Sequence, residues 1–75
     1  MRNELIGVKT TIIFEALNDL GWSKIDQKSL NGCFLTLLTR QNDKLIVIEE
    51  TSYWAQIDAS TENLDELNNH IETST

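Results

Sequence analysis

The sequence predicts an α+β fold, a two-layer sandwich in which a helix, a three-stranded antiparallel meander and a second helix follow one another along the chain. Three observations lead to this prediction. Three short runs rich in aliphatic, β-branched and aromatic residues lie between residues 33 and 58, separated by polar breaks. Segments with the apolar spacing of an amphipathic helix flank these runs on both sides. A chain of 75 residues suits one small domain.

The first element is a helix expected within residues 3–20. Its second half is clearest, because apolar residues recur there with the spacing i, i+3, i+4, i+7. Gly7 and the β-branched residues after it lower helix propensity, so a short strand over Leu5–Val8 is the alternative. Gly21 follows the last periodic residue and suits a left-handed C-cap, with Trp22 folding back onto the helix end.

The meander comes next. Residues 23–32 alternate polar and apolar side chains only weakly, so they are interpreted as a loop or as a short edge strand protected by two lysines. Asn31-Gly32 is a turn signal. The three strands are predicted at Cys33–Thr39, Lys44–Glu49 and Tyr53–Asp58.

Side chains alternate between the two faces of each predicted strand. One set is assigned to the face that the helices cover: Cys33, Leu35, Leu37, Ile46, Ile48, Ala55 and Ile57. The opposite face still carries a large apolar load, and such a load marks a contact surface for a partner or a second copy. The predicted apolar contact patch consists of Phe34, Leu38, Leu45, Val47 and Trp54.

The last element is a helix expected over about residues 62–72, with Ser60 or Thr61 as its N-cap. Its leucines and isoleucine form one narrow stripe that docks on the sheet, and acidic side chains occupy the opposite face. The whole chain is expected to be a single domain. Residues 1–2 and 73–75 are expected to be frayed.

Charge is the most informative feature of the composition. Twelve acidic residues against six basic ones give a net charge of −6. Residues 45–75 contain seven of the acids and no lysine or arginine. Such a half repels phosphate backbones and anionic membranes and attracts a basic protein surface. The predicted partner-binding residues are these seven acids: Glu49, Glu50, Asp58, Glu62, Asp65, Glu66 and Glu72.

The sequence offers little catalytic chemistry. One cysteine, Cys33, and one histidine, His70, do not supply the spacing of a metal site, and the isolated glycines form no phosphate-binding loop. We therefore expect a protein that is not an enzyme and has no catalytic residue, cofactor or metal. The chain shows no signal peptide and no apolar run of membrane-spanning length, and its cysteine is alone, so we expect the reducing cytoplasm.

The predicted element order matches that of double-stranded-RNA-binding domains, but an acidic helix replaces their basic second helix, which argues against direct nucleic-acid binding. In architecture and charge the chain is similar to small phage and mobile-element inhibitors, including some anti-CRISPR proteins built as helix, three strands and helix. The leading hypothesis is a non-enzymatic acidic protein that binds a basic protein surface, most specifically a nucleic-acid mimic that inhibits a nucleic-acid-handling complex. The alternatives are a small homodimeric structural or adaptor module, and an immunity or antitoxin protein that neutralises a basic toxin.

Overall fold

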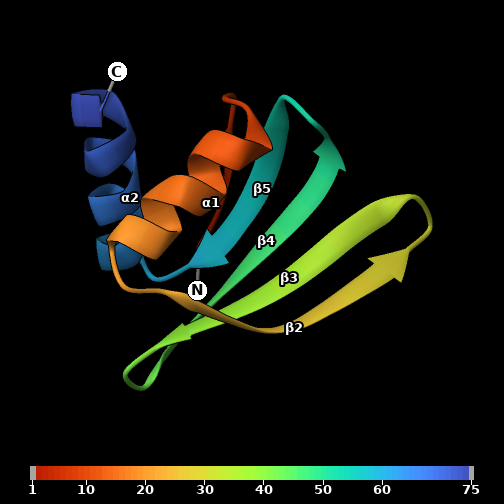
Figure 1. Cartoon of the computed structure of the whole chain (residues 1–75), viewed down its shortest axis with the longest axis horizontal. Coiled ribbons are helices and arrows are strands. Elements are labelled where there is room, and N and C mark those ends of the chain that lie inside the picture. The colour runs from red at the N-terminus through yellow and green to blue at the C-terminus, as the bar shows by residue number, and fades with distance from the viewer. Residues whose placement is uncertain (1, 75) are drawn as a thin grey trace.

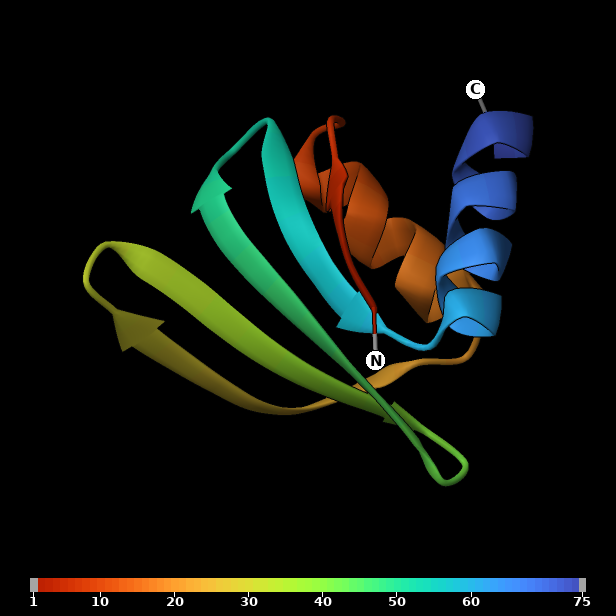
Figure 2. The same cartoon turned by 180° about the vertical axis from the view of Figure 1, so that it is seen from behind.

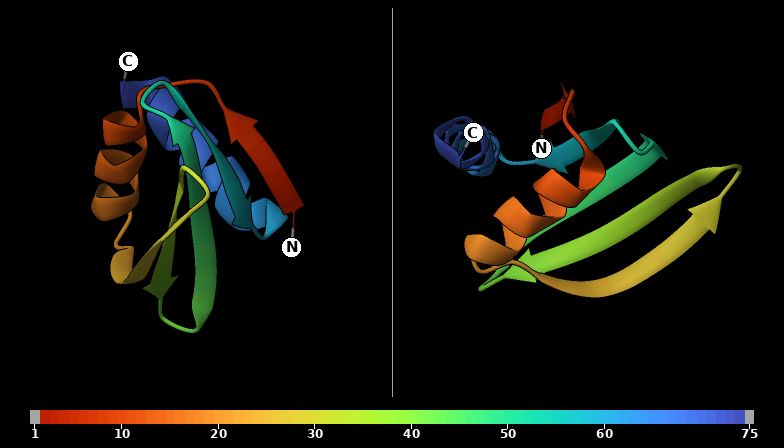
Figure 3. Two further views of the ribbon diagram at one scale, coloured as in Figure 1. Left: turned by 90° about the vertical axis from the view of Figure 1, so that its right-hand side faces the viewer. Right: turned by 45° about the horizontal axis from the view of Figure 1, so that its top comes forward.

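The computed structural model describes residues 2–74, and within them the element order is β1-α1-β2-β3-β4-β5-α2 (Figure 1). The strands are β1 Arg2–Ile6, β2 Ser23–Leu30, β3 Cys33–Arg40, β4 Asp43–Thr51 and β5 Trp54–Ala59, and the helices are α1 Thr10–Asp19 and α2 Thr61–Ser74. The five described strands form one antiparallel sheet in the order β1-β5-β4-β3-β2. Figures 1 and 3 show α1 and α2 side by side on one face of this sheet, while the β2–β3 hairpin reaches away from them.

The predicted sandwich of helix, three strands and helix is therefore wrong. The meander is present, but the sheet has two further strands: β1 pairs with β5, and β2 pairs with β3. The alternatives considered for these segments, a short strand near residues 5–8 and an edge strand within residues 23–32, come closer to what is observed. β1 pairs with a strand about fifty residues away, and every residue of β2 is exposed, so neither strand has the local apolar alternation that identifies a half-buried strand.

The hydrophobic core lies between the sheet and the two helices. Burying one large aliphatic side chain contributes roughly 1.5–3 kcal/mol, so several such residues on each helix are enough to hold the helix on the sheet. The helices contribute Ile13, Ala16, Leu17, Leu64, Leu67 and Ile71. The sheet contributes Ile6, Leu38, Leu45, Val47, Ala55, Ile57 and Ala59.

The predicted face assignment is wrong for β3 and β4. Leu38, Leu45 and Val47, which were assigned to the contact patch, are at most 2% exposed and form part of the core. The set assigned to the core from the same strands, Cys33, Leu35, Leu37, Ile46 and Ile48, lies on the face away from the helices, because side chains alternate along a strand. For β5 the predicted face assignment is correct, because Ala55 and Ile57 are buried on the side that the helices cover. Both faces of β3 and β4 are apolar, so alternation alone does not identify the covered one.

Two local predictions are confirmed. Asn31 and Gly32 form the two-residue turn between β2 and β3, with φ values of 50° and 83°. Gly21 ends α1 at φ 90°, and the N–H of Trp22 donates to the carbonyl of Leu17 at 2.9 Å, which completes a left-handed helix cap. Trp22 folds back as expected and is 4% exposed.

α2 is longer than predicted. Ser60 is its N-cap, since the Ser60 hydroxyl accepts a hydrogen bond from the N–H of Asn63 at 3.2 Å. The helix continues through Thr73 and Ser74, where a frayed tail was predicted, and both hydroxyls donate to the carbonyl of His70. Arg2, also predicted to be frayed, begins β1. Residues 1 and 75 lie outside the described part of the chain.

Candidate protein-binding surface

Two neighbouring helices carry a concentration of acidic side chains. In residues 10–19 and 61–74 all the acids are exposed, and neither helix contains lysine or arginine. α1 brings its acids beside α2 because both helices dock on the same sheet face through their apolar sides (Figure 1). We refer to this set as the acidic helix surface: Glu15, Asp19, Glu62, Asp65, Glu66 and Glu72.

Some of these carboxylates are compensated within the molecule and others are not. Glu66 accepts a charged hydrogen bond from Arg40 at 2.6 Å, and Asp19 lies 3.2 Å from the ring Nε2 of His70. Glu15, Glu62 and Asp65 make no ion pair with any residue between 2 and 74. These three exposed charges therefore remain available to a partner.

Arg40 fixes the position of α2 relative to the rest of the molecule. One guanidinium nitrogen, Nη1, donates to the carbonyl of Leu20 at 3.0 Å as well as to Glu66, and Nη2 donates to the side-chain oxygen of Asn63 at 3.1 Å. The guanidinium also lies 4.7 Å from the ring centroid of Trp22. One β3 side chain thus ties the end of α1 to the first turns of α2, so the carboxylates of α2 are held on an ordered element.

A shallow groove of about 150 Å³ separates α1 from α2. Apolar side chains from both helices line it: Ile12, Ala16 and Ile71. The exposed carboxylates of Glu15 and Asp19 belong to its α1 side. An apolar groove beside carboxylates matches a lysine or arginine side chain, whose methylene stem packs on apolar atoms while its charged end meets an acid.

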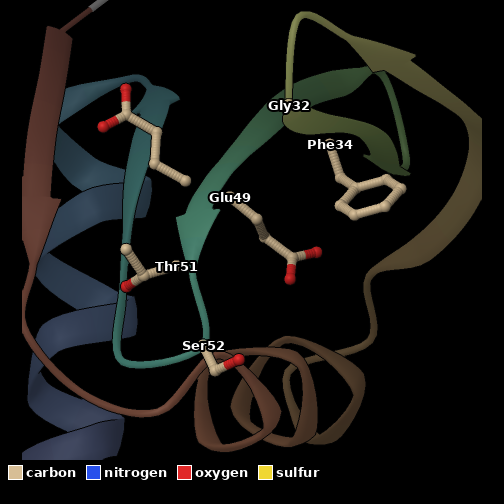
Figure 4. A pocket seen from close by; sticks show the side chains of 6 residues that line it. Gly32, Phe34, Glu49, Thr51 and Ser52 are labelled. Carbon is tan, nitrogen blue, oxygen red and sulfur yellow. The ribbon is translucent and has the colours of Figure 1, made fainter.

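The remaining predicted partner-binding residues lie elsewhere. Glu49 and Glu50 line a separate hollow of about 180 Å³, which we call the corner hollow. Figure 4 shows the carboxylate of Glu49 and the ring of Phe34 in this hollow; the two residues are direct cross-strand partners. Asp58 is on β5, on the face of the sheet away from the helices. The seven predicted acids therefore do not form one surface, although Glu62, Asp65, Glu66 and Glu72 do lie together on α2.

The predicted apolar patch is also dispersed. Its three aliphatic members are in the core, as described above. Phe34 is 50% exposed but belongs to the corner hollow on the helix side of the sheet. Trp54 is half-buried and lies on the opposite face, as predicted. These five residues do not form one contact surface.

Sequence reasoning missed Glu15 and Asp19. A signal was present, because these acids are four residues apart in a predicted amphipathic helix and so share one side of it. The prediction considered net charge by half of the chain, and the first half contains all six basic residues, so its acids were not considered as binding residues. Only the docking of α1 beside α2 places these acids on an element next to the acidic α2.

The described residues place little reactive chemistry on this surface. Between residues 2 and 74 no three His, Cys, Asp or Glu side chains gather as a metal-binding group. Cys33 is on the face of the sheet away from the helices, whereas His70 is on α2, so the sheet separates the thiol from the imidazole.

α1 and α2, at 10 and 14 residues, are both too short and too polar to cross a bilayer.

Comparisons with protein-family models, with curated proteins and with solved structures found no match to this chain. No relative therefore indicates a role for the acidic helix surface. Its distinguishing features are the uncompensated acids and the groove between the helices.

Proposed function

We propose that this chain is a non-enzymatic interaction protein that binds a basic protein surface through the acidic helix surface. One observation carries the proposal: two adjacent helices present six acids and no lysine or arginine within their described residues, and three of those acids have no ion-pair partner in residues 2–74. Charges within about 8–10 Å of one another act together at physiological salt. Such a field accelerates the encounter with an oppositely charged surface and excludes anionic partners.

The groove between α1 and α2 gives the partner a point of attachment. A lysine or arginine of the partner would lay its stem on Ala16 and Ile71 and meet the uncompensated carboxylate of Glu15, beside the Asp19–His70 pair. Fixed anchors of this type account for most of the energy of an interface, whereas the surrounding acids contribute mainly to the rate of association.

The most specific form of the proposal is a nucleic-acid mimic that inhibits a nucleic-acid-handling complex. Carboxylates at positions i, i+3 and i+4 of a helix stand roughly 5–6 Å apart at Cβ. Glu62, Asp65 and Glu66 follow this spacing on α2; Arg40 compensates and holds Glu66, and the charges of Glu62 and Asp65 remain uncompensated. A rigid row of negative charges at this separation can occupy a cleft that otherwise binds the phosphates of DNA or RNA. Binding to the partner should then compete with nucleic acid.

The test compares two charge reversals of equal size. Glu62→Lys with Asp65→Lys alters the acidic helix surface, and Glu49→Lys with Glu50→Lys alters the corner hollow. A basic protein captured from the native host by the wild-type chain should bind the first variant at least about tenfold more weakly and the second nearly normally, because only the first removes the charges that face it. Wild-type binding should also weaken between about 50 mM and 500 mM salt, and duplex DNA or RNA should displace the partner if the mimic form is correct.

Circular dichroism and thermal unfolding must accompany the binding measurement. Glu62 lies in the first turn of α2, where an acid favours the helix dipole, so its reversal costs roughly 0.3–1 kcal/mol of stability without unfolding the helix. Equal affinity in both variants would mean that the acids only solvate the surface. Loss of binding in the second variant alone would move the binding site to the corner hollow.

A further inference from the structure

The face of the sheet opposite the helices is apolar, and no element of residues 2–74 covers it; Figure 2 views the molecule from this side. Leu30 is 53% exposed, and its neighbours on this face are half-buried. A shallow depression of about 290 Å³ lies between β2 and β4. We call this region the open sheet face; its large apolar residues are Leu5, Leu30, Leu35, Leu37, Ile46, Ile48 and Trp54.

The strand register arranges this face in two neighbouring rows that run across the strands. The first row reads Asp26, Leu37, Ile46, Asp58 and Asn3, from β2 to β1. The second reads Lys28, Leu35, Ile48, Gln56 and Leu5. At the β2 end the first row has an acid and the second a base. Further along, Asp58 of the first row is beside Gln56 of the second.

We propose that a second copy of this chain covers the open sheet face, related by a two-fold axis that lies between the two rows and runs across the strands. This axis places the first row of each copy on the second row of the other. Asp26 then faces the partner's Lys28, Asp58 faces the partner's Gln56, and the aliphatic residues of the central strands face one another. The two sheets pack as in an aligned sandwich, about 10 Å apart.

The charges favour this axis over a two-fold axis parallel to the strands. A two-fold axis parallel to β4 would place each row on itself, with β5 facing the partner's β3. Asp58 would then be buried against the partner's Leu37, and an unpaired buried carboxylate is strongly unfavourable. The axis across the strands places both acids of the two rows, Asp26 and Asp58, opposite a side chain that can donate a hydrogen bond.

The area agrees with a reversible dimer. Five strands spaced about 4.8 Å apart, each about 25 Å long, present roughly 600 Å² per copy, or about 1,200 Å² in the pair, the lower limit for stable interfaces. We therefore expect a dissociation constant in the micromolar range. The proposal is independent of the proposed function, because a dimer through this face leaves the acidic helix surface of both copies exposed.

Sedimentation equilibrium over a wide concentration range tests the second copy. The mass should rise toward twice 8.6 kDa as concentration increases. Leu35→Thr should weaken dimerisation at least about tenfold, because Leu35 is at the centre of the face. Phe34→Thr is the matched control: Phe34 is the adjacent residue on β3 and points to the other side of the sheet, so this variant should dimerise like the wild type. A monomer at every concentration overturns the proposal, and so does a dimer that Leu35→Thr does not weaken.

A charge exchange tests the axis. Lys28→Asp places an acid opposite an Asp26 in both symmetry-related pairs, which lie together at the β2 end of the interface, and should weaken the dimer about tenfold. Asp26→Lys combined with Lys28→Asp restores opposite charges across the axis and should recover wild-type affinity within about threefold. Both variants keep their residues on an exposed edge strand, so the fold should be unaffected. A double variant that dimerises no better than Lys28→Asp overturns the proposed pairing.

Discussion

Gly21 ends α1 in a backbone conformation that L-amino acids rarely adopt. Its φ is 90°, and the N–H groups of Gly21 and Trp22 donate to the carbonyls of Asn18 and Leu17. These bonds close the helix and turn Trp22 into the core, where the Arg40 guanidinium lies against its ring. The Gly21 cap therefore positions Trp22, and Trp22 provides the ring against which the Arg40 guanidinium lies.

Gly21→Ala should lower the free energy of unfolding by about 1–2 kcal/mol, the cost of a left-handed backbone with a Cβ atom. The nearest atom to the added Cβ would be Cδ of Arg40 at 3.7 Å, an ordinary contact, so the loss comes from the backbone and not from a collision. Urea unfolding measures it. Gly7→Ala is the control, because its φ is not in the left-handed region and nothing lies within 4 Å of the new atom. Equal effects at both positions would contradict this explanation.

Among the elements, those with strong local patterns were predictable. α1, α2 and the three central strands have the apolar periodicity expected of them, and the glycine and asparagine signals at their ends were interpreted correctly. β1 and β2 were considered only as alternatives to a helix and to a loop, because the first is held by a non-local pairing and the second has no buried residue. Short edge strands of this kind are stabilised by the neighbouring strand more than by their own composition.

The orientation of β3 and β4 depended on information that the sequence did not contain. Both faces of these strands are apolar, and the choice between them is made by register: Leu38 is opposite Leu45, and Val47 is opposite Ile57 on the buried side. The same ambiguity explains why the prediction placed the uncovered apolar face of β3 and β4 on the wrong residues. A sheet with two apolar faces and helices on one of them must expose the other face.

The contact between β1 and α2 makes stability depend on pH. The carboxylate of Glu4 on β1 accepts hydrogen bonds from Arg2 and from Asn68 of α2. Both bonds lower the pKa of Glu4 from its ordinary value of 4.5, and the bond from Arg2 has the larger effect. The folded-state pKa is then below that of the unfolded chain. The stabilisation is fully present above pH 4.5 and is lost as the pH falls through the folded-state pKa.

Glu4→Gln should therefore be less stable than the wild type at pH 7, and the difference should shrink as the pH falls below 4.5. Urea unfolding at several pH values measures this difference, and NMR titration of the carboxyl carbon measures the pKa of Glu4 directly. In Arg2→Gln the pKa of Glu4 should move back toward its ordinary value, because the largest cause of the shift has been removed. A Glu4 carboxyl that titrates at or above 4.5 in the folded wild type would refute the argument.

In the whole molecule, charge differs between the two layers as well as between the two halves of the chain. Five of the six basic residues are in strands, and α1 and α2 contain acids alone among their charged side chains. The sequence predicted the acidic second half correctly but could not show that α1, from the basic half, adds two acids to the same surface. Arg40 connects the two layers: it extends from β3 to the end of α1 and to α2, where it pairs with the carboxylate of Glu66.

Arg40→Met should lower the free energy of unfolding by about 2–3 kcal/mol, because Leu20, Asn63 and Glu66 all lose a charged donor while methionine keeps the apolar contact with the core. Lys44→Met is the control: it makes the same change in net charge on an exposed residue of β4, so its effect should stay below about 0.5 kcal/mol. Unfolding is measured in urea at low and high salt. The difference between the variants should persist at high salt, because salt screens the general repulsion among the acids more than it weakens these directed, partly buried hydrogen bonds. If both variants lose the same stability, or if the difference disappears in salt, then Arg40 acts only through its charge and does not join the helices to the sheet.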